Sequence, residues 1–305
     1  MNEIQKQILD KIAGIQNAPD NAYNFRVNGK SENHASTPNI MISFKEDGTG
    51  IDIHVKPGTK GEQVHIPVII SDSDLTETVY NDFYIGEDAD VTIVAGCGIH
   101  NCGEQRSQHD GIHSFYVEKN AKIKYIEKHY GEGDGNGIRI MNPVTNIHLK
   151  ENSYMEMDTV QIKGIDSTTR VTKSDLGDNA TLIIKEKLMT HGKQYAETEF
   201  EVSLDGKNSS ANVISRSVAK DDSQQVFLSK ITGNEACMGH SECDAIIMDH
   251  ACVKAIPEIT ANHVDASLIH EAAIGKIAGE QLIKLMTLGL TEAEAEAQIV
   301  NGFLK

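Results

Sequence analysis

A short pattern that recurs along the chain constrains the fold more than any other feature of the sequence. It consists of an aliphatic residue, three mostly polar residues and a small residue, and an alternating apolar–polar run follows each copy. Four copies begin at Ile85, Val117, Leu149 and Leu176 and end at Ala89, Ala121, Ser153 and Ala180. A copy with one extra residue begins at Leu204, and Ile247 with Ala251 forms another. Alternating runs bounded by Gly, Asp and Asn are typical of β-strands separated by turns.

The spacing of these copies indicates how the strands are arranged. The starting residues from Ile85 to Leu204 lie 32, 32, 27 and 28 positions apart. A near-regular period of this size with strands and no helices indicates a β-solenoid, in which each coil buries its apolar face on its neighbours. A β-sandwich built from similar hairpins is the alternative. We predict a mainly β protein with a solenoid core over residues 38–265.

The N-terminal residues 1–37 have a different character. Ile4, Ile8, Ile12 and Ile15 share one helical face, which predicts an amphipathic helix that ends near residues 14–17. We interpret residues 21–39 as an irregular connection between this helix and the solenoid.

Residues 266–305 are expected to form a C-terminal helical segment. The first predicted helix has an apolar stripe and ends at Gly289, a residue type common just after a helix. Thr291 and Glu294 have the spacing of a capping box and predict the start of a second helix. Such helices are expected either to cover the open end of a solenoid or to form a docking surface.

Charge and composition exclude several classes of function. The net charge of −17 disfavours nucleic acid and anionic membranes as partners, and no apolar run is long enough to span a bilayer. The sequence contains no Walker A motif, so we expect no nucleotide to bind through such a loop. The first residues lack the pattern of a signal peptide, and the five cysteines form an odd set. These features predict reduced thiols and a cytoplasmic protein.

Two places near the C-terminus carry residue types that bind metals. Cys243 lies between Glu242 and Asp244, which would raise the pKa of its thiol, so a nearby cation would be needed to make it reactive. It is either a buried small apolar residue or a ligand. His270 and Glu271 are adjacent, and on a strand they would point to opposite faces, so only one of them would face a given site.

Cys97, His100 and Cys102 form a third candidate set of metal ligands. Four residues intervene between the two cysteines, which falls within the two to four of a zinc knuckle, but no second Cys/His pair lies at the spacing of a zinc finger. The alternatives are a metal site and ordinary solenoid or loop residues.

Several short segments in the last third of the chain resemble the SufB/SufD family, the scaffold proteins of Fe–S cluster assembly. In order, these segments are ISRSVAK (214–220), GHSECDAIIMD (239–249), PEI (257–259), HEAAIGKI (270–277), the QLIKLMTLGL helix and EAQIVNGF (296–303). Residues 80–210 are similar to the family only in their β-helical style. The chain resembles a compact SufB-like member without the long N-terminal extension.

The resemblance implies a right-handed parallel β-helix that dimerises, and C-terminal helices that dock a SufC-type ABC ATPase. It implies that Cys243, His270 and Glu271 are cluster-assembly residues, and that Cys243 of one protomer faces His270 of the other. Ile269 stands where SufB-type members often carry a glutamate, so one candidate carboxylate is missing. The partner is expected to be a second copy or a SufB/SufD-type protein.

The function predicted from the resemblance is that of a non-enzymatic scaffold that carries a transient Fe–S cluster. A metal-free adaptor of the ATPase is one alternative. A carbohydrate-active β-helix enzyme is another, although the chain has no Trp and 5% aromatic residues, which leaves few platforms for sugar stacking.

Overall fold

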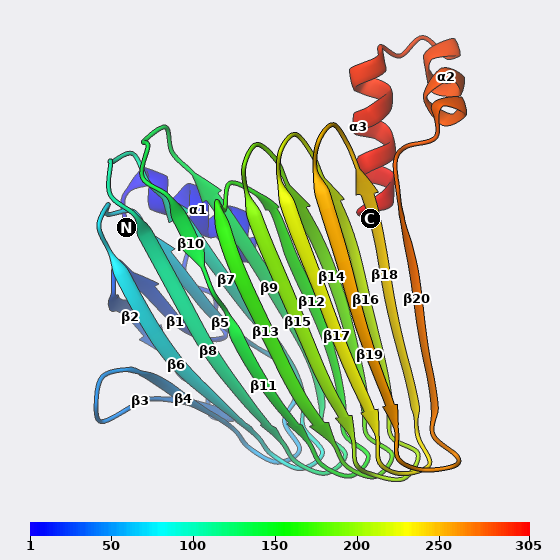
Figure 1. Cartoon of the computed structure of the whole chain (residues 1–305). Coiled ribbons are helices and arrows are strands. Elements are labelled where there is room, and N and C mark those ends of the chain that lie inside the picture. The colour runs from blue at the N-terminus through cyan, green and yellow to red at the C-terminus, as the bar shows by residue number, and fades with distance from the viewer.

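The computed structural model describes residues 1–305 and has the predicted mainly β architecture, a two-sheeted β-solenoid with helices at its ends (Figure 1). Each coil contributes one strand to sheet A and one to sheet B, and the chain returns to the same sheet in the next coil. From β4 onwards, neighbouring strands within each sheet are parallel. In spatial order, sheet A contains β2 (Lys30–Ala35), β1 (Ala22–Val27), β5 (Lys60–Ile70), β7 (Asp90–His100), β9 (Lys122–Glu132), β12 (Tyr154–Lys163), β14 (Thr181–Thr190), β16 (Ser210–Ala219), β18 (Met238–Ile247) and β20 (Ser267–Gly275).

Sheet B contains, in the same direction, β3 (Ile40–Phe44), β4 (Gly50–Val55), β6 (Thr76–Ile85), β8 (Ser107–Val117), β10 (Arg139–Met141) and β11 (Val144–Leu149), β13 (Ser167–Leu176), β15 (Tyr195–Leu204), β17 (Gln224–Gly233) and β19 (Cys252–Ala261). Both β10 and β11 pair with β8 and β13, so together they occupy one strand position.

The five copies from Ile85 to Leu204 form the turns that lead from sheet B to sheet A, whereas the Ile247–Ala251 copy joins β18 to β19 and leads from sheet A to sheet B. In the second copy the amide of Ala121 donates to the carbonyl of Glu118 (3.2 Å), and Asn120 has a left-handed φ of 60°. Asn tolerates this backbone conformation better than most residues. The side chain of Asn152 donates to Asn120 Oδ1 (3.2 Å), and Asn120 donates to Asp88 Oδ1 (3.0 Å), so successive turns are hydrogen-bonded into a ladder. The five copies from Ile85 to Leu204 therefore mark successive coils, as predicted.

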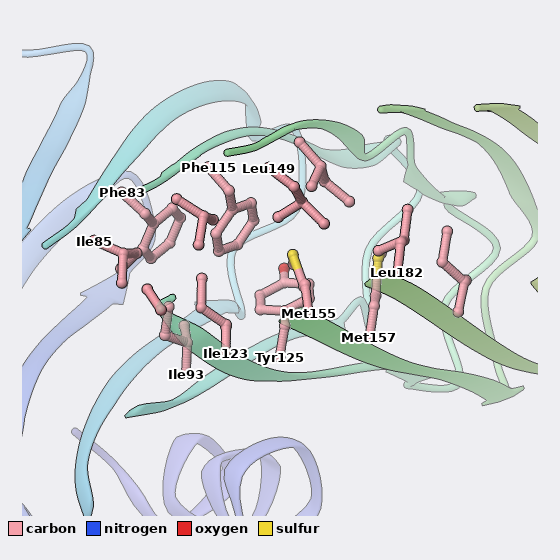
Figure 2. Close-up of a cluster of buried hydrophobic side chains, with 14 of the residues drawn as sticks. Phe83, Ile85, Ile93, Phe115, Ile123, Tyr125, Leu149, Met155, Met157 and Leu182 are labelled. Atoms are coloured by element: carbon pink, nitrogen blue, oxygen red, sulfur yellow. The ribbon is translucent and has the colours of Figure 1, made fainter. Parts of the chain in front are cut away.

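A continuous apolar core fills the space between the two sheets. One cluster of 36 buried residues runs along the solenoid, and Figure 2 shows part of it, with Phe83 and Phe115 facing Ile123 and Tyr125 across the interior. The rings of Phe83 and Phe115, from adjacent coils, stack with a centroid separation of 4.3 Å. Burial of one such side chain is worth about 1.5–3 kcal/mol, and each coil gains it only by stacking on the next.

Helix α1 (Glu3–Ala13) covers the outer face of sheet A near its N-terminal end. It is capped by Asn2 and Gln5 and ends at Gly14, whose φ is 68°. Ile8 and Ile12 are buried against β7, where Gly96 and Gly98 provide the space. Ile4, which was expected on the buried face, is 40% exposed, and Leu9 is buried in its place.

The expectation of an irregular connection over residues 21–39 was wrong. Strands β1 and β2 form an antiparallel hairpin there, and β1 also pairs in parallel with β5. Asn28 and Gly29 at the hairpin turn both have positive φ, at 46° and 79°. The hairpin therefore places an antiparallel edge on sheet A.

The C-terminal segment begins with strand β20, and two short helices follow it. Helix α2 (Gly279–Thr287) buries no residue, whereas α3 (Glu292–Phe303) begins at the predicted Thr291–Glu294 capping box. Val300 and Leu304 pack with Val218 of β16. The helices thus lie beside the end of sheet A (Figure 1), while side chains of β19 and β20 remain largely exposed. No helix is long and apolar enough to cross a membrane.

Candidate functional site

Cys243 and His270 lie on the last two strands of sheet A. The parallel register pairs Ser241 of β18 with His270 of β20, and Cys243 with Ala272. Because side chains alternate along a strand, Cys243, Ser241 and His270 all point to the interior of the solenoid. The backbones of Cys243 and His270 are about 8 Å apart, given strand spacing and rise. One chain therefore brings both residues together at the open end.

A buried polar network leads from the middle of the solenoid towards Cys243. Arg170 forms an ion pair with Glu127 and lies 3.7 Å from Glu186. Glu186 also accepts hydrogen bonds from Thr198 Oγ1 (2.9 Å) and Ser215 Oγ (2.7 Å). Burial alone would raise the pKa of Glu127, but the Arg170 charge holds it well below its ordinary value. The network is thus a set of interior charges that are paired and hydrogen-bonded.

Cys243 is 1% exposed and directly beside Ser215 in the strand register. Burial raises the pKa of its thiol to about 12, and the negative charges of Glu186 and Asp244 add to this effect. A thiol in this environment stays protonated at neutral pH, so it becomes a ligand only when a cation replaces the proton. Of the two acidic neighbours expected to raise this pKa, Glu242 and Asp244, the effect comes from Asp244, and Glu186 adds to it from two coils away.

The pKa of His270 is shifted in the opposite direction to that of Cys243. Its Nδ1 atom is buried and has no hydrogen-bond partner. Burial lowers the pKa of the imidazole, and the nearby His240 lowers it further. A neutral imidazole with an unpartnered nitrogen is the form of histidine that binds metals.

Glu271 lies on the outer face of sheet A, as expected for a neighbour of an inward-pointing residue. It pairs in register with Glu242, and its carboxylate is 3.8 Å from His240 Nε2. Glu271 is thus separated by the strand from the face that carries Cys243.

In the third candidate set, the structure places Cys97 apart from His100 and Cys102. Cys97 points into the interior. Burial alone would raise the pKa of its thiol, but the nearby His109 and His129 lower it to about 7. His100 and Cys102 contact each other away from it, with 3.0 Å between Nε2 and Sγ. No group of three or more His, Cys, Asp or Glu side chains is arranged to hold a metal ion. Cys97 is thus not brought together with the other two.

The polar network was missed in the sequence analysis. Glu127, Arg170 and Glu186 each occupy an inward position in an alternating strand, which is the signal that could have revealed them. Their contacts depend on the register between coils of different length, and the alternation of apolar and polar residues does not predict that register.

Comparison with known proteins supports the resemblance found in the sequence. The family model for "SUF system FeS cluster assembly, SufBD core domain" matches residues 68–303. An iron-sulfur cluster assembly SufBD family protein of Methanothermobacter thermautotrophicus is 31% identical over 265 residues, which cover 84% of this chain and 62% of that protein. One of Archaeoglobus fulgidus is 30% identical over 270 residues, with coverages of 85% and 69%. One of Methanocaldococcus jannaschii is 27% identical over 270 residues, with coverages of 87% and 84%.

The chain spans less than two thirds of the first of these relatives and most of the third. The matched region includes most of the solenoid, Cys243, His270 and both C-terminal helices. On this evidence, the chain belongs to the SufBD family of iron–sulfur cluster assembly proteins.

Proposed function

We propose that this chain is a non-enzymatic cytoplasmic scaffold on which an Fe–S cluster is built or held, with Cys243 and His270 as ligands. The observation that carries the proposal is their common inward orientation on the last two strands of sheet A. Thiolate is the preferred ligand of Fe–S clusters, and histidine replaces it at some sites. The cluster is cargo here, so an incomplete ligand set suits a protein that must release it.

The remaining ligands would come from a second chain at the open end of the solenoid. Strands β19 and β20 are the free edges of their sheets. Ile256, Ile269 and Ile274 on these strands are 39%, 51% and 38% exposed. Free strand edges with exposed apolar side chains favour association with another protein. The partner is a second copy or a SufB/SufD-type protein, and twofold pairing would place two Cys243–His270 sets at the interface.

Residues 266–305 are proposed to dock a SufC-type ABC ATPase. Helix α2 buries none of its residues, and Ile283 and Met286 on it are 63% and 42% exposed. Leu288, just after it, is 77% exposed. Nucleotide would be bound by the ATPase, and its hydrolysis would shift the population towards a state in which the buried Cys243 becomes accessible.

Anaerobic reconstitution with iron and sulfide tests the scaffold proposal. Visible charge-transfer absorption is expected in the wild type and should be lost in Cys243→Ala and weakened in His270→Ala. Cys237→Ala and Cys252→Ala are matched controls, because one removes a buried thiol and the other an exposed thiol of the same coils. Both controls should keep the chromophore.

Absence of a chromophore from the wild type, with the ATPase still bound, would instead favour the metal-free adaptor. A chromophore that survives Cys243→Ala but is lost in Cys97→Ala or Cys102→Ala would move the site to the third candidate set. Glu271→Gln tests whether Glu271 assists His270 from the outer face, since full cluster assembly in that variant would remove Glu271 from the site.

A further inference from the structure

A row of cationic side chains crosses the outer face of sheet A. The parallel register aligns Lys128 of β9 with Val160 of β12, Val160 with Lys187 of β14, and Lys187 with Arg216 of β16. Three of the four positions are cationic, and we call Lys128, Lys187 and Arg216 the basic row. It spans about 14 Å, which is three strand spacings.

Two acidic side chains beside the basic row pair with cations outside it. Lys124 lies 3.7 Å from Asp158 and Lys185 lies 2.9 Å from Glu156. Lys128 and Arg216 form no such ion pair, although Arg216 stands beside Asp244 in register, and Lys187 donates to the main-chain oxygen of Lys305. The adjacent cations Lys187 and Arg216 repel each other, and an anion placed between them reduces this cost.

The surface around the row is hollow and partly apolar. A groove of about 520 Å³ is lined by the basic row and by three half-buried apolar side chains, Ile126, Val160 and Ile214. Three acidic residues also line it, Glu156, Asp158 and Glu186, and each lies within 4 Å of a lysine or arginine. Lys187 Nζ lies 2.7 Å from the main-chain oxygen of Lys305, so the segment after α3 borders the groove. The groove is on the outside of the solenoid, opposite to the face that carries Cys243.

We propose that this groove docks an acidic, amphipathic segment of a partner protein. Charge complementarity carries the assignment, because cations outnumber carboxylates in the lining of this groove on a chain of net charge −17. Three cations spread over about 14 Å match carboxylates on successive turns or alternate residues of a peptide better than a single small anion. The three apolar side chains between them match the leucine or isoleucine side chains of an amphipathic segment.

Binding of a fluorescein-labelled peptide tests the proposal by fluorescence anisotropy. The probe is a peptide with glutamate and leucine on opposite helical faces. The wild type should bind it with an affinity that falls as salt rises. Replacing the basic row by Lys128→Gln, Lys187→Gln and Arg216→Gln should weaken binding at least tenfold. Val160→Asp, which keeps all three cations, should also weaken binding.

The matched control has the same change in net charge. Lys150→Gln, Lys193→Gln and Lys207→Gln together remove three exposed cations outside the groove, and this variant should bind within twofold of the wild type. An equal loss in both triple variants would overturn the proposal, since only net charge would matter. It would also be overturned if the wild type did not bind, or if tripolyphosphate bound as tightly and Val160→Asp had no effect.

Discussion

Replacing Arg170 by alanine is expected to lower the free energy of unfolding by about 3–5 kcal/mol at neutral pH, because it removes the guanidinium that faces two buried carboxylates and leaves Glu127 with His129 as its remaining cationic partner. The side chains of Arg170, Glu127 and Glu186 are 4%, 2% and 4% exposed, so water cannot take over the lost interaction. Thr198 and Ser215 would still donate to Glu186, but hydroxyl groups carry no net charge. Urea unfolding followed by circular dichroism measures the change, and it suits a chain without Trp.

The pH dependence of the variant separates this mechanism from simple loss of packing. In the wild type the pKa of Glu127 is depressed, so its contribution to stability is present above the pKa of the unfolded chain and is lost as pH falls. Without Arg170, burial would raise the pKa of Glu127 above its unfolded value, and stability would then fall as pH rises through the unfolded value. The deficit of the variant should therefore be smaller at pH 5 than at pH 7.

Lys119→Ala is the control, because Lys119 pairs with Glu151 at the surface, where the two side chains are 45% and 49% exposed. Such a pair contributes about 0–1 kcal/mol. A loss below about 1 kcal/mol in Arg170→Ala, or an equal deficit at pH 5 and pH 7, would refute the reasoning. Adding Glu127→Gln and Glu186→Gln to Arg170→Ala should restore part of the stability, since the uncompensated charges are then removed.

Three further predictions follow from burial and backbone geometry. Brief alkylation with iodoacetamide, read by mass spectrometry, should label Cys252 and leave Cys243 unmodified, and equal labelling would contradict the buried site. Asn152→Ala should cost about 1 kcal/mol in urea unfolding, because φ at this position is 58°, whereas Asn152→Gly should cost less; equal costs would argue against backbone strain. Gly98→Ala should release α1, since a Cβ atom there would lie 2.1 Å from Ile8 Cγ2. Hydrogen exchange should then increase in α1 alone, and unchanged protection would contradict this packing.

Much of the solenoid was predictable because its turns are encoded locally. The Leu149–Ser153 copy contains the residues that its turn requires. Leu149 enters the core, Asn152 adopts a left-handed conformation and Ser153 is buried at the corner of the coil. The β1–β2 hairpin was not predictable in the same way. Strand β1 is buried on both faces and shows no alternation, and β2 is a polar edge strand.

The candidate site was only partly predictable for a related reason. Alternation indicates that His270 and Glu271 face opposite sides, and the structure confirms this. Which of them shares a side with Cys243 depends on the register between β18 and β20. The resemblance to the family identified the residues, but their arrangement within one chain came only from that register.

The two ends of the solenoid differ in a way that limits how many copies can assemble end to end. At the N-terminal end, the edges are β2 and β3, which pair antiparallel with the strand beside them, and β2 has the polar sequence KSENHA. At the C-terminal end, the edges are the parallel strands β19 and β20. A molecule with one receptive end forms a closed pair, whereas two matching ends would allow growth into a filament. In the proposed end-to-end pairing, the β1–β2 hairpin would therefore prevent growth beyond two copies.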